Sequence, residues 1–166
     1  MQVTTAGLDL ASNILQVHGI TEAGDVAVDR SLRRALVLAF FERMDACLVG
    51  IEACGTSHHW ARELTKPGHE VRLIPPVYVK PNVKRGKSDA VDAEAICEAV
   101  TRPTMRFVEI KSVEQQAALS LHRARDLIVR LRTRLINMLR SLYAEIGISI
   151  APGLARRSAM PKLARR

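Results

Sequence analysis

The stretch from Ser112 to Ile146 contains neither proline nor glycine, and its apolar residues recur at alternating spacings of four and three. These apolar positions are Ala117, Leu121, Ala124, Ile128, Leu131, Leu135, Met138 and Leu142. Such a heptad seam predicts one long helix that packs along its length on something else. A helix on the order of 50 Å long exceeds what a small domain can cover. We therefore expect a homo-oligomer formed through this helix, with another helix or the preceding domain as the alternative.

The long helix divides the chain into three predicted parts: a domain over residues 1–111, the helix over 112–148, and a basic linker or disordered tail over 149–166. Residues 1–110 contain 13 Lys and Arg against 14 Asp and Glu, whereas residues 111–166 contain 12 against 3. A near-neutral domain with a basic arm suits a protein that holds a polyanion such as DNA. The alternative is a solvated basic helix kept soluble by its charge.

The remaining composition predicts a reduced, cytoplasmic protein with no membrane partner. Cys47, Cys54 and Cys97 show no paired spacing, which argues against a disulfide framework and against a structural zinc site. The opening residues MQVTTAGLDL lack the basic and apolar regions of a signal peptide. No apolar run approaches the roughly 20 residues that a membrane helix needs.

The first 100 residues predict an α/β fold. Residues 3–10, 14–20 and 26–31 have the composition of strands, and their short connections imply antiparallel hairpins. A helix over 34–44, a strand over 47–51, a helix over 56–66 and a strand over 71–74 follow. Residues 78–87 form a basic loop, and Ser88 can cap a helix over 89–100. This order predicts a mixed sheet with helices on its faces.

Four carboxylates stand where such a fold gathers its active site. Asp9 lies in the first strand, Glu52 follows the fourth, and Asp89 and Asp92 are spaced to share one face of a helix. If they converge, they form a hard oxygen site suited to Mg²⁺, with room for two metal ions, and to phosphodiester chemistry.

Three of the four acids also have a purely structural interpretation. Asp9 could cap the turn after its strand instead of binding a metal. Asp89 and Asp92 could be ordinary first-turn acids that meet the positive end of the helix dipole. The residues alone leave both interpretations open.

Basic residues near these acids and on the long helix are candidates for nucleic-acid binding, because they can neutralise phosphates. They are Lys84, Arg85 and Lys87 in the loop, and Arg123, Arg125, Arg130, Arg132 and Arg134 on the helix.

Several segments together resemble one protein family. GLD in the first strand, IEACG after the fourth, VRLIPPVYVKPNVKRGKSDAVDAEAICEAVTRP, and SVEQQA at the start of the long helix are similar to bacterial insertion-sequence transposases of the DEDD class, the IS-one-ten and IS-eleven-eleven group. The resemblance runs from about residue 6 to about residue 155. It implies an RNase H-like, RuvC-type fold followed by a coiled-coil helix. It places the DEDD tetrad, which binds Mg²⁺ and acts on DNA, on Asp9, Glu52, Asp89 and Asp92.

The resemblance also sets expectations about partners and completeness. It implies DNA transposition and recombination near the bacterial nucleoid, with an element-encoded guide RNA as a possible partner. Family members carry a second, C-terminal domain with a serine thought to attack DNA, and the sequence stops before it. We therefore expect a truncated copy with incomplete recombination activity. The alternative is a non-catalytic module for nucleic-acid binding and dimerisation.

Overall fold

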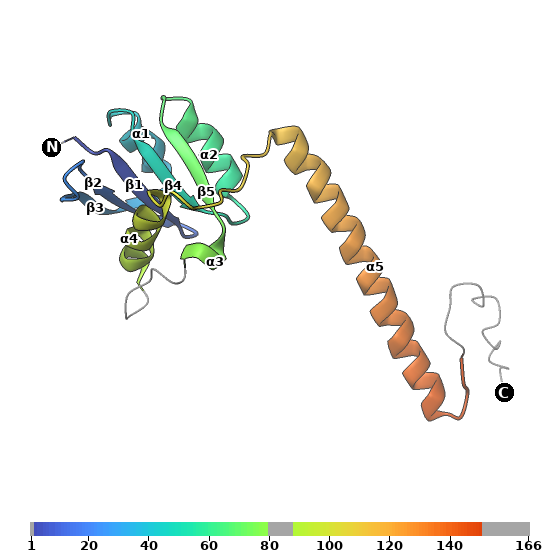
Figure 1. Ribbon diagram of the computed structural model, residues 1–166. Coiled ribbons are helices and arrows are strands. Elements are labelled where there is room, and N and C mark those ends of the chain that lie inside the picture. Colours follow the sequence, from blue (N-terminus) through green and yellow to red (C-terminus); the bar gives the residue numbers. More distant parts are fainter. Residues whose placement is uncertain (1, 80–87, 151–166) are drawn as a thin grey trace. The chain divides into compact units, whose positions relative to one another are not determined.

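The computed structural model describes residues 2–79 and 88–150. The chain divides into two compact units, Met1–Ser112 and Val113–Arg166, which are described separately. The first unit is a five-stranded mixed sheet with helices on both faces (Figure 1). The expected α/β class is therefore confirmed.

The sheet combines an antiparallel meander with two parallel strands. β1 (Thr5–Leu10), β2 (Ile14–Ile20) and β3 (Val26–Arg33) pair antiparallel, as their short connections predicted. β4 (Leu48–Glu52) pairs parallel with β1, and β5 (Glu70–Ile74) pairs parallel with β4. The strand order is β3-β2-β1-β4-β5, the mixed sheet expected of an RNase H-like fold. The carboxyl ends of β1, β4 and β5 consequently share one edge of the sheet.

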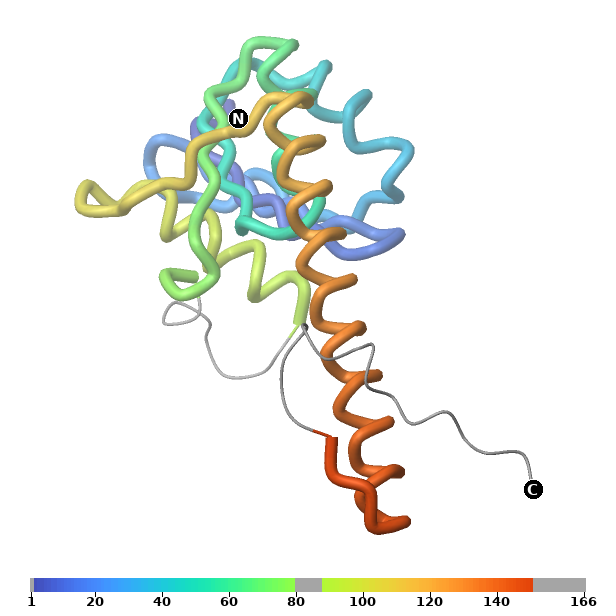
Figure 2. Tube along the Cα trace, turned by 90° about the vertical axis from the view of Figure 1, so that its right-hand side faces the viewer, coloured from blue at the N-terminus to red at the C-terminus, as the bar shows by residue number. Residues whose placement is uncertain are grey.

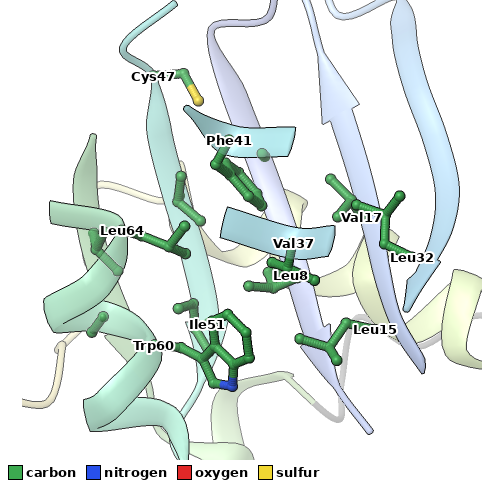
Figure 3. Packing of buried hydrophobic residues seen from close by; sticks show 14 of the residues in the cluster. Leu8, Leu15, Val17, Leu32, Val37, Phe41, Cys47, Ile51, Trp60 and Leu64 are labelled. Atoms are coloured by element: carbon green, nitrogen blue, oxygen red, sulfur yellow. The ribbon is translucent and has the colours of Figure 1, made fainter. Parts of the chain in front are cut away.

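One face of the sheet is covered by α1 (Val37–Phe41) and α2 (Ser57–Thr65). Phe41, Trp60 and Leu64 from these helices pack with Leu8 and Ile51 from the two central strands (Figure 3). Burying a side chain of this size contributes about 1.5–3 kcal/mol. This layer is therefore the main hydrophobic core of the unit.

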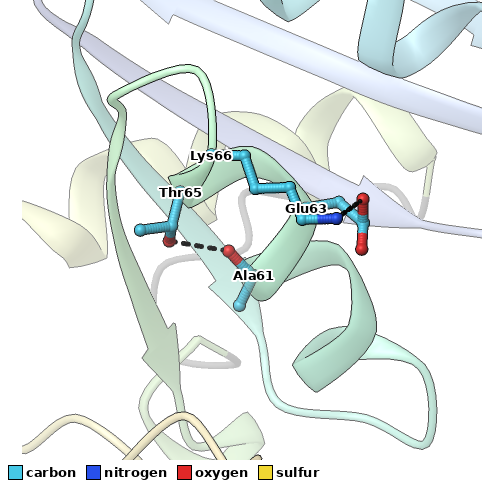
Figure 4. Close-up of polar contacts among 4 residues, drawn as sticks. All are labelled: Ala61, Glu63, Thr65 and Lys66. Carbon is cyan, nitrogen blue, oxygen red and sulfur yellow. Dashed lines mark hydrogen bonds and ion pairs between the residues drawn. The ribbon is translucent and has the colours of Figure 1, made fainter. Parts of the chain in front are cut away.

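The end of α2 leads directly into the turn before β5. Thr65 Oγ1 donates a hydrogen bond of 2.8 Å to the carbonyl of Ala61, and Lys66 Nζ lies 2.6 Å from a Glu63 oxygen (Figure 4). The Lys66 ammonium is largely exposed, so solvent screens this pair and it adds little to stability. Gly68 has a φ of +101°, a backbone conformation that favours glycine and lets the chain reverse.

His69, the residue before β5, links the end of α1 to the start of β4 through hydrogen bonds. The amide of Cys47 donates to His69 Nδ1 over 3.2 Å, so the proton lies on Nε2, which is 2.9 Å from the carbonyl of Phe41. The ring is buried. It therefore connects the end of α1 to the residue before β4 through backbone groups that would otherwise be buried without partners.

Two expectations from the sequence are corrected by the structure. The helix over 34–44 is instead a short 3₁₀ turn, η1 (Arg34–Leu36), followed by the five residues of α1. Val37, Phe40 and Phe41 have weak helix propensity, and tertiary burial rather than length holds this segment. Tyr78 and Val79, expected at the start of the basic loop, instead lie in the short helix α3 (Pro76–Val79), whose first position tolerates Pro76 well. Residues 80–87 of that loop lie outside the described residues.

The described part of the second unit contains one long helix, α5 (Val113–Glu145), of 33 residues, which runs without a break (Figure 2). It ends at Gly147, whose φ is +79°, and the amide of Ile148 donates back to the carbonyl of Tyr143 over 2.8 Å. None of its residues is buried, and the side chains of the heptad seam are exposed. Within the described residues, no helix combines the length and apolarity needed to cross a membrane.

Candidate functional site

Asp9 and Glu52 lie side by side at the carboxyl ends of the two central strands. Leu8 and Ile51 are partners in the parallel β1–β4 pair, so the next residues along, Asp9 and Glu52, are also adjacent. Leu8 and Ile51 point into the core beneath α1 and α2. Since side chains alternate along a strand, Asp9 and Glu52 point to the opposite face.

That opposite face is covered by α4 (Asp89–Val100), which lies very close to two glycines. A Cβ atom on Gly7 would lie 2.1 Å from the carbonyl oxygen of Ala93, and one on Gly50 would lie 2.8 Å from Val100 Cβ. Gly7 and Gly50 are themselves partners across β1 and β4. The two glycines form a bare shelf that lets the helix backbone approach the sheet.

Asp89 and Asp92 occupy the first turn of α4, as the sequence predicted. Ser88 begins the helix, and its Oγ accepts a hydrogen bond of 3.3 Å from the amide of Val91. Because Ala93 rests on Gly7, the first turn of the helix lies beside the strand end that carries Asp9. The shelf thus brings the helix acids toward the strand acids.

The electrostatics of Asp9 reflect this arrangement. Its pKa is raised from the usual 3.8 to about 6. Burial is the largest cause, followed by the negative charges of Asp92, Asp89 and Glu52, in that order. A hydrogen bond from the Leu10 backbone opposes these effects. All three other acids therefore act on Asp9 at close range, and a cation placed among them would relieve the repulsion.

The four acids are neighbours, but their oxygens do not form a coordination shell. Across residues 2–79 and 88–150, no three His, Cys, Asp or Glu side chains are close enough together to hold a metal ion as they stand. The backbone positions set the electrostatic coupling, whereas coordination distances also depend on the rotamers. Rotation of these side chains would be needed to bring them onto one ion.

Gln16 is a neighbour of Asp9 that the sequence did not single out. It is the direct partner of Asp9 across the antiparallel β1–β2 pair, so both side chains lie on the same face. It is only 6% exposed, and its Nε2 donates to Asp29 Oδ1 over 2.6 Å. Ser31 Oγ donates to its Oε1 over 2.5 Å. A fixed carboxamide thus flanks the strand acids.

The candidate nucleic-acid-binding residues are distributed differently. Lys84, Arg85 and Lys87 lie outside the described residues. The second unit presents its five candidates on the exposed surface of α5: Arg123, Arg125, Arg130, Arg132 and Arg134. One of them, Arg130, forms an ion pair of 2.6 Å with Asp126 one turn earlier.

Comparison with known proteins places the chain in a family. A family model described as a transposase, of the DEDD and IS110 type, matches residues 6–148. The chain is 53% identical over 148 residues to a probable family 20 transposase of Pseudomonas aeruginosa, covering 89% of this chain and 44% of that one. It is 42% identical over 150 residues to the transposase for insertion sequence element IS1111A of Coxiella burnetii, covering 90% and 41%.

A putative transposase of Sinorhizobium fredii is 46% identical over 159 residues, covering 96% of this chain and 41% of the relative. The chain thus spans less than half the length of these curated relatives. Among solved structures, it is similar to Thermus thermophilus RuvC in complex with a Holliday junction substrate, with a TM-score of 0.47 and 14% identity over 65% of this chain and 100% of that one. By its match over residues 6–148 and its close relatives, the chain belongs to the IS110-type family of DEDD transposases.

Proposed function

We propose that the first unit binds Mg²⁺ between Asp9, Glu52, Asp89 and Asp92, and that the protein uses this site on DNA strands during transposition. The observation that carries the proposal is the packing of α4 on Gly7 and Gly50, which brings Asp89 and Asp92 toward the strand ends that carry Asp9 and Glu52. The raised pKa of Asp9, to which all three other acids contribute, supports it. Family membership supports the same reaction class.

The donor set fits this cation. Mg²⁺ is a hard ion that takes carboxylate oxygens and keeps several waters, and four carboxylates supply enough oxygens for one ion or for two. When bound, the ion would stabilise charge on a phosphate and acidify a bound water. The strands hold Asp9 and Glu52 in fixed positions, and the first turn of α4 supplies Asp89 and Asp92. Gln16 keeps the flank of the site polar.

The basic residues would hold the nucleic acid. The arginines of α5 can neutralise phosphates, and an element-encoded guide RNA is a second polyanion that they could bind. The exposed seam of α5 would form a coiled coil with a second copy of the chain. We place this activity in the bacterial cytoplasm, at the nucleoid.

A second candidate function is nucleic-acid binding and dimerisation without catalysis. The exposed apolar seam flanked by arginines favours it, because both activities could reside in α5 alone. In this case the acids of the first unit would only shape the fold.

Calorimetry with Mg²⁺ tests the metal site. The wild-type chain should bind the ion, and Asp9→Ala or Asp92→Ala should abolish the binding heat. Asp45→Asn is the matched control, because it removes an exposed acid at the other end of β4 and should leave binding unchanged. Binding that persists in both Asp9→Ala and Asp92→Ala would remove the metal site from the proposal.

Labelled DNA from the ends of an insertion element distinguishes the two candidate functions. Cutting or joining that depends on Mg²⁺, and that is lost in Asp9→Ala, supports a catalytic site. A gel shift alone, weakening steeply with salt and insensitive to Asp9→Ala, supports the binding module.

A further inference from the structure

A small cavity of about 250 Å³ lies in the first unit, beyond the C-terminal end of α4. Its walls are Tyr78, Arg102, Thr104, Met105 and Arg106. None of these residues belongs to the acid tetrad or to the candidate basic residues found in the sequence. Two guanidinium groups, a hydroxyl, an aromatic ring and a thioether make it a basic cavity with one apolar wall.

The backbone around the cavity is fixed at several points. The amides of Arg102 and Met105 donate to the carbonyls of Ala99 and Arg102, forming two consecutive turns after α4. Further along, the amide of Val108 donates to the carbonyl of Leu73 over 2.7 Å, which attaches the segment to the edge of the sheet.

Side-chain contacts hold the same segment. The Arg72 guanidinium stacks 5.0 Å from the centre of the Phe107 ring, next to the cavity residue Arg106. On the other wall, the amide of Tyr78 donates to the carbonyl of Pro75 and closes the turn of α3. The cavity is therefore framed by anchored segments.

The charge of the cavity is positive. Arg102 forms an ion pair of 2.8 Å with Glu98, in which both side chains are about half exposed. This geometry orients the guanidinium and leaves several of its donors for another partner. Among the described residues, Arg106 forms no ion pair. Both arginines line the cavity, and only Arg102 has a carboxylate partner, Glu98. Two guanidinium groups on one wall favour an anion, and their planar donors match a phosphate group.

The aromatic side chain of the cavity, Tyr78, indicates that the ligand carries a base as well as a phosphate. Tyr78 is 42% exposed, so part of its ring can be reached by a ligand. Bases stack on aromatic rings with little dependence on sequence, because every base has a π-face. The volume is below the usual range for small-molecule pockets, about 300–1,000 Å³, so it admits one nucleotide unit rather than a large cofactor.

The location of the cavity relates it to the acids. Tyr78 follows β5, whose carboxyl end lies at the same sheet edge as Asp9 and Glu52. The 12 residues of α4 separate Asp89 from the cavity, and a helix of that length spans about 18 Å. A phosphate at Asp89 therefore lies about one helix length from the cavity, and the cavity is a contact separate from the first turn of α4.

We propose that this cavity binds one nucleotide of a DNA strand, with the phosphate on Arg102 and Arg106 and the base stacked on Tyr78. The proposal rests on the proposed function for the choice of DNA, and it adds a contact remote from the metal site. The strand would be held there while another phosphate lies at the acids.

The test is binding of a short oligothymidylate to the full chain in buffer with EDTA and without Mg²⁺. The Tyr78 ring signals and the Arg106 Nε–H signal should shift in NMR spectra on titration. Arg106→Ala should weaken binding by about tenfold and reduce the salt slope by about one phosphate contact. Tyr78→Leu should weaken binding, and Tyr78→Phe should retain it because the stacking surface remains.

Arg43→Ala is the matched control, since it removes an exposed arginine from the far face of the sheet. Binding equal to wild type in Arg106→Ala and Tyr78→Leu would overturn the proposal, as would the absence of shifts at Tyr78. Tighter binding of an oligouridylate would overturn the assignment to DNA. Asp9→Asn should retain the Tyr78 shifts, because the probe needs no metal. Loss of Mg²⁺ binding in calorimetry therefore tests the acids separately from the cavity.

Discussion

Gly7 and Gly50 are partners in the parallel β1–β4 pair, and α4 rests on both of them. The two residues are far apart in sequence but form one bare shelf on the sheet. Asp9 and Glu52 each lie two residues further along the same strands, on the same face. The close approach of α4 at the glycines therefore determines how near its first-turn acids come to the strand acids.

Replacing Gly7 by valine should displace α4 and impair the site. Its Cβ would collide with the Ala93 carbonyl at 2.1 Å and the Cys97 amide nitrogen at 2.6 Å, both backbone atoms that cannot yield locally. We expect a loss of about 1–3 kcal/mol of stability in urea unfolding, together with loss of Mg²⁺ binding in calorimetry. Gly55→Ala is the control, because nothing lies within 4 Å of its added methyl. A Gly7→Val protein as stable as wild type would contradict the close packing of the α4 backbone on Gly7.

Asp9→Asn should stabilise the metal-free protein at neutral pH. The pKa of Asp9 is raised from 3.8 to about 6, so folding favours the protonated carboxyl. Its stabilising contribution is fully present below about pH 4 and is lost as pH rises through 6. Asparagine cannot ionise and escapes that loss. A pKa raised from 3.8 to about 6 corresponds to about 2.7 kcal/mol, which solvent screening at this partly exposed carboxyl reduces to about 1 kcal/mol.

The measurement is urea unfolding in EDTA between pH 4 and pH 8. The advantage of Asp9→Asn over wild type should grow with pH across this window. Asp45→Asn, which alters an exposed acid away from the site, should follow the wild-type curve. A pH-independent difference for Asp9→Asn would show that folding does not raise the pKa of Asp9.

Only one of the three cysteines should react with iodoacetamide in the folded protein at pH 8. Burial raises the pKa of Cys47 and of Cys97 to about 11, and both thiols are enclosed by the fold. Cys54 is exposed beside the end of β4. Mass spectrometry should find one adduct, and three in urea. The folded Cys54→Ser protein should give no adduct. An adduct on Cys97 in that protein would indicate that α4 leaves the sheet.

Leu135→Asp should lower the oligomeric state seen in sedimentation. Leu135 lies in the middle of the α5 seam and is exposed within the chain, so a coiled-coil partner would bury it. A buried carboxylate without a counter-ion costs several kcal/mol. Thr133→Asp introduces the same charge on the opposite side of the helix and should leave the oligomer intact. An unchanged sedimentation coefficient for Leu135→Asp would exclude this seam as the interface.

Local patterns in the sequence predicted most of the fold. Neighbours in the chain determine each of these patterns: the apolar run of β1, the alternating residues of β2, the cap at Ser88, and the proline-free and glycine-free run of α5. The segment after β3 was predicted too long, because its helix depends on burial of Val37 and Phe41 against a sheet that no local pattern describes. The short helix α3 was likewise not indicated by any local pattern.

The sequence predicted which acids belong to the candidate site, but not the packing that brings them together. Strand ends and helix starts identified the four carboxylates, whose metal-binding role stays a prediction. The role of Gly7 was not apparent from the sequence, because its meaning depends on Ala93 and Cys97 at the other end of the unit. Gln16 and the cavity at Tyr78 were also not apparent from the sequence, because the residues they contact come from other strands or from beyond α4.

The placement of α4 over β1 has a consequence for the order in which the protein is made. Chains are synthesised from the N-terminus at about 5–20 residues per second, so β1 leaves the ribosome several seconds before the helix that covers it. Until then, the glycine face of β1 and β4 has no cover, and only two of the four acids exist. The helix that supplies the last two of the four acids is therefore also the element that ends the exposure of the sheet.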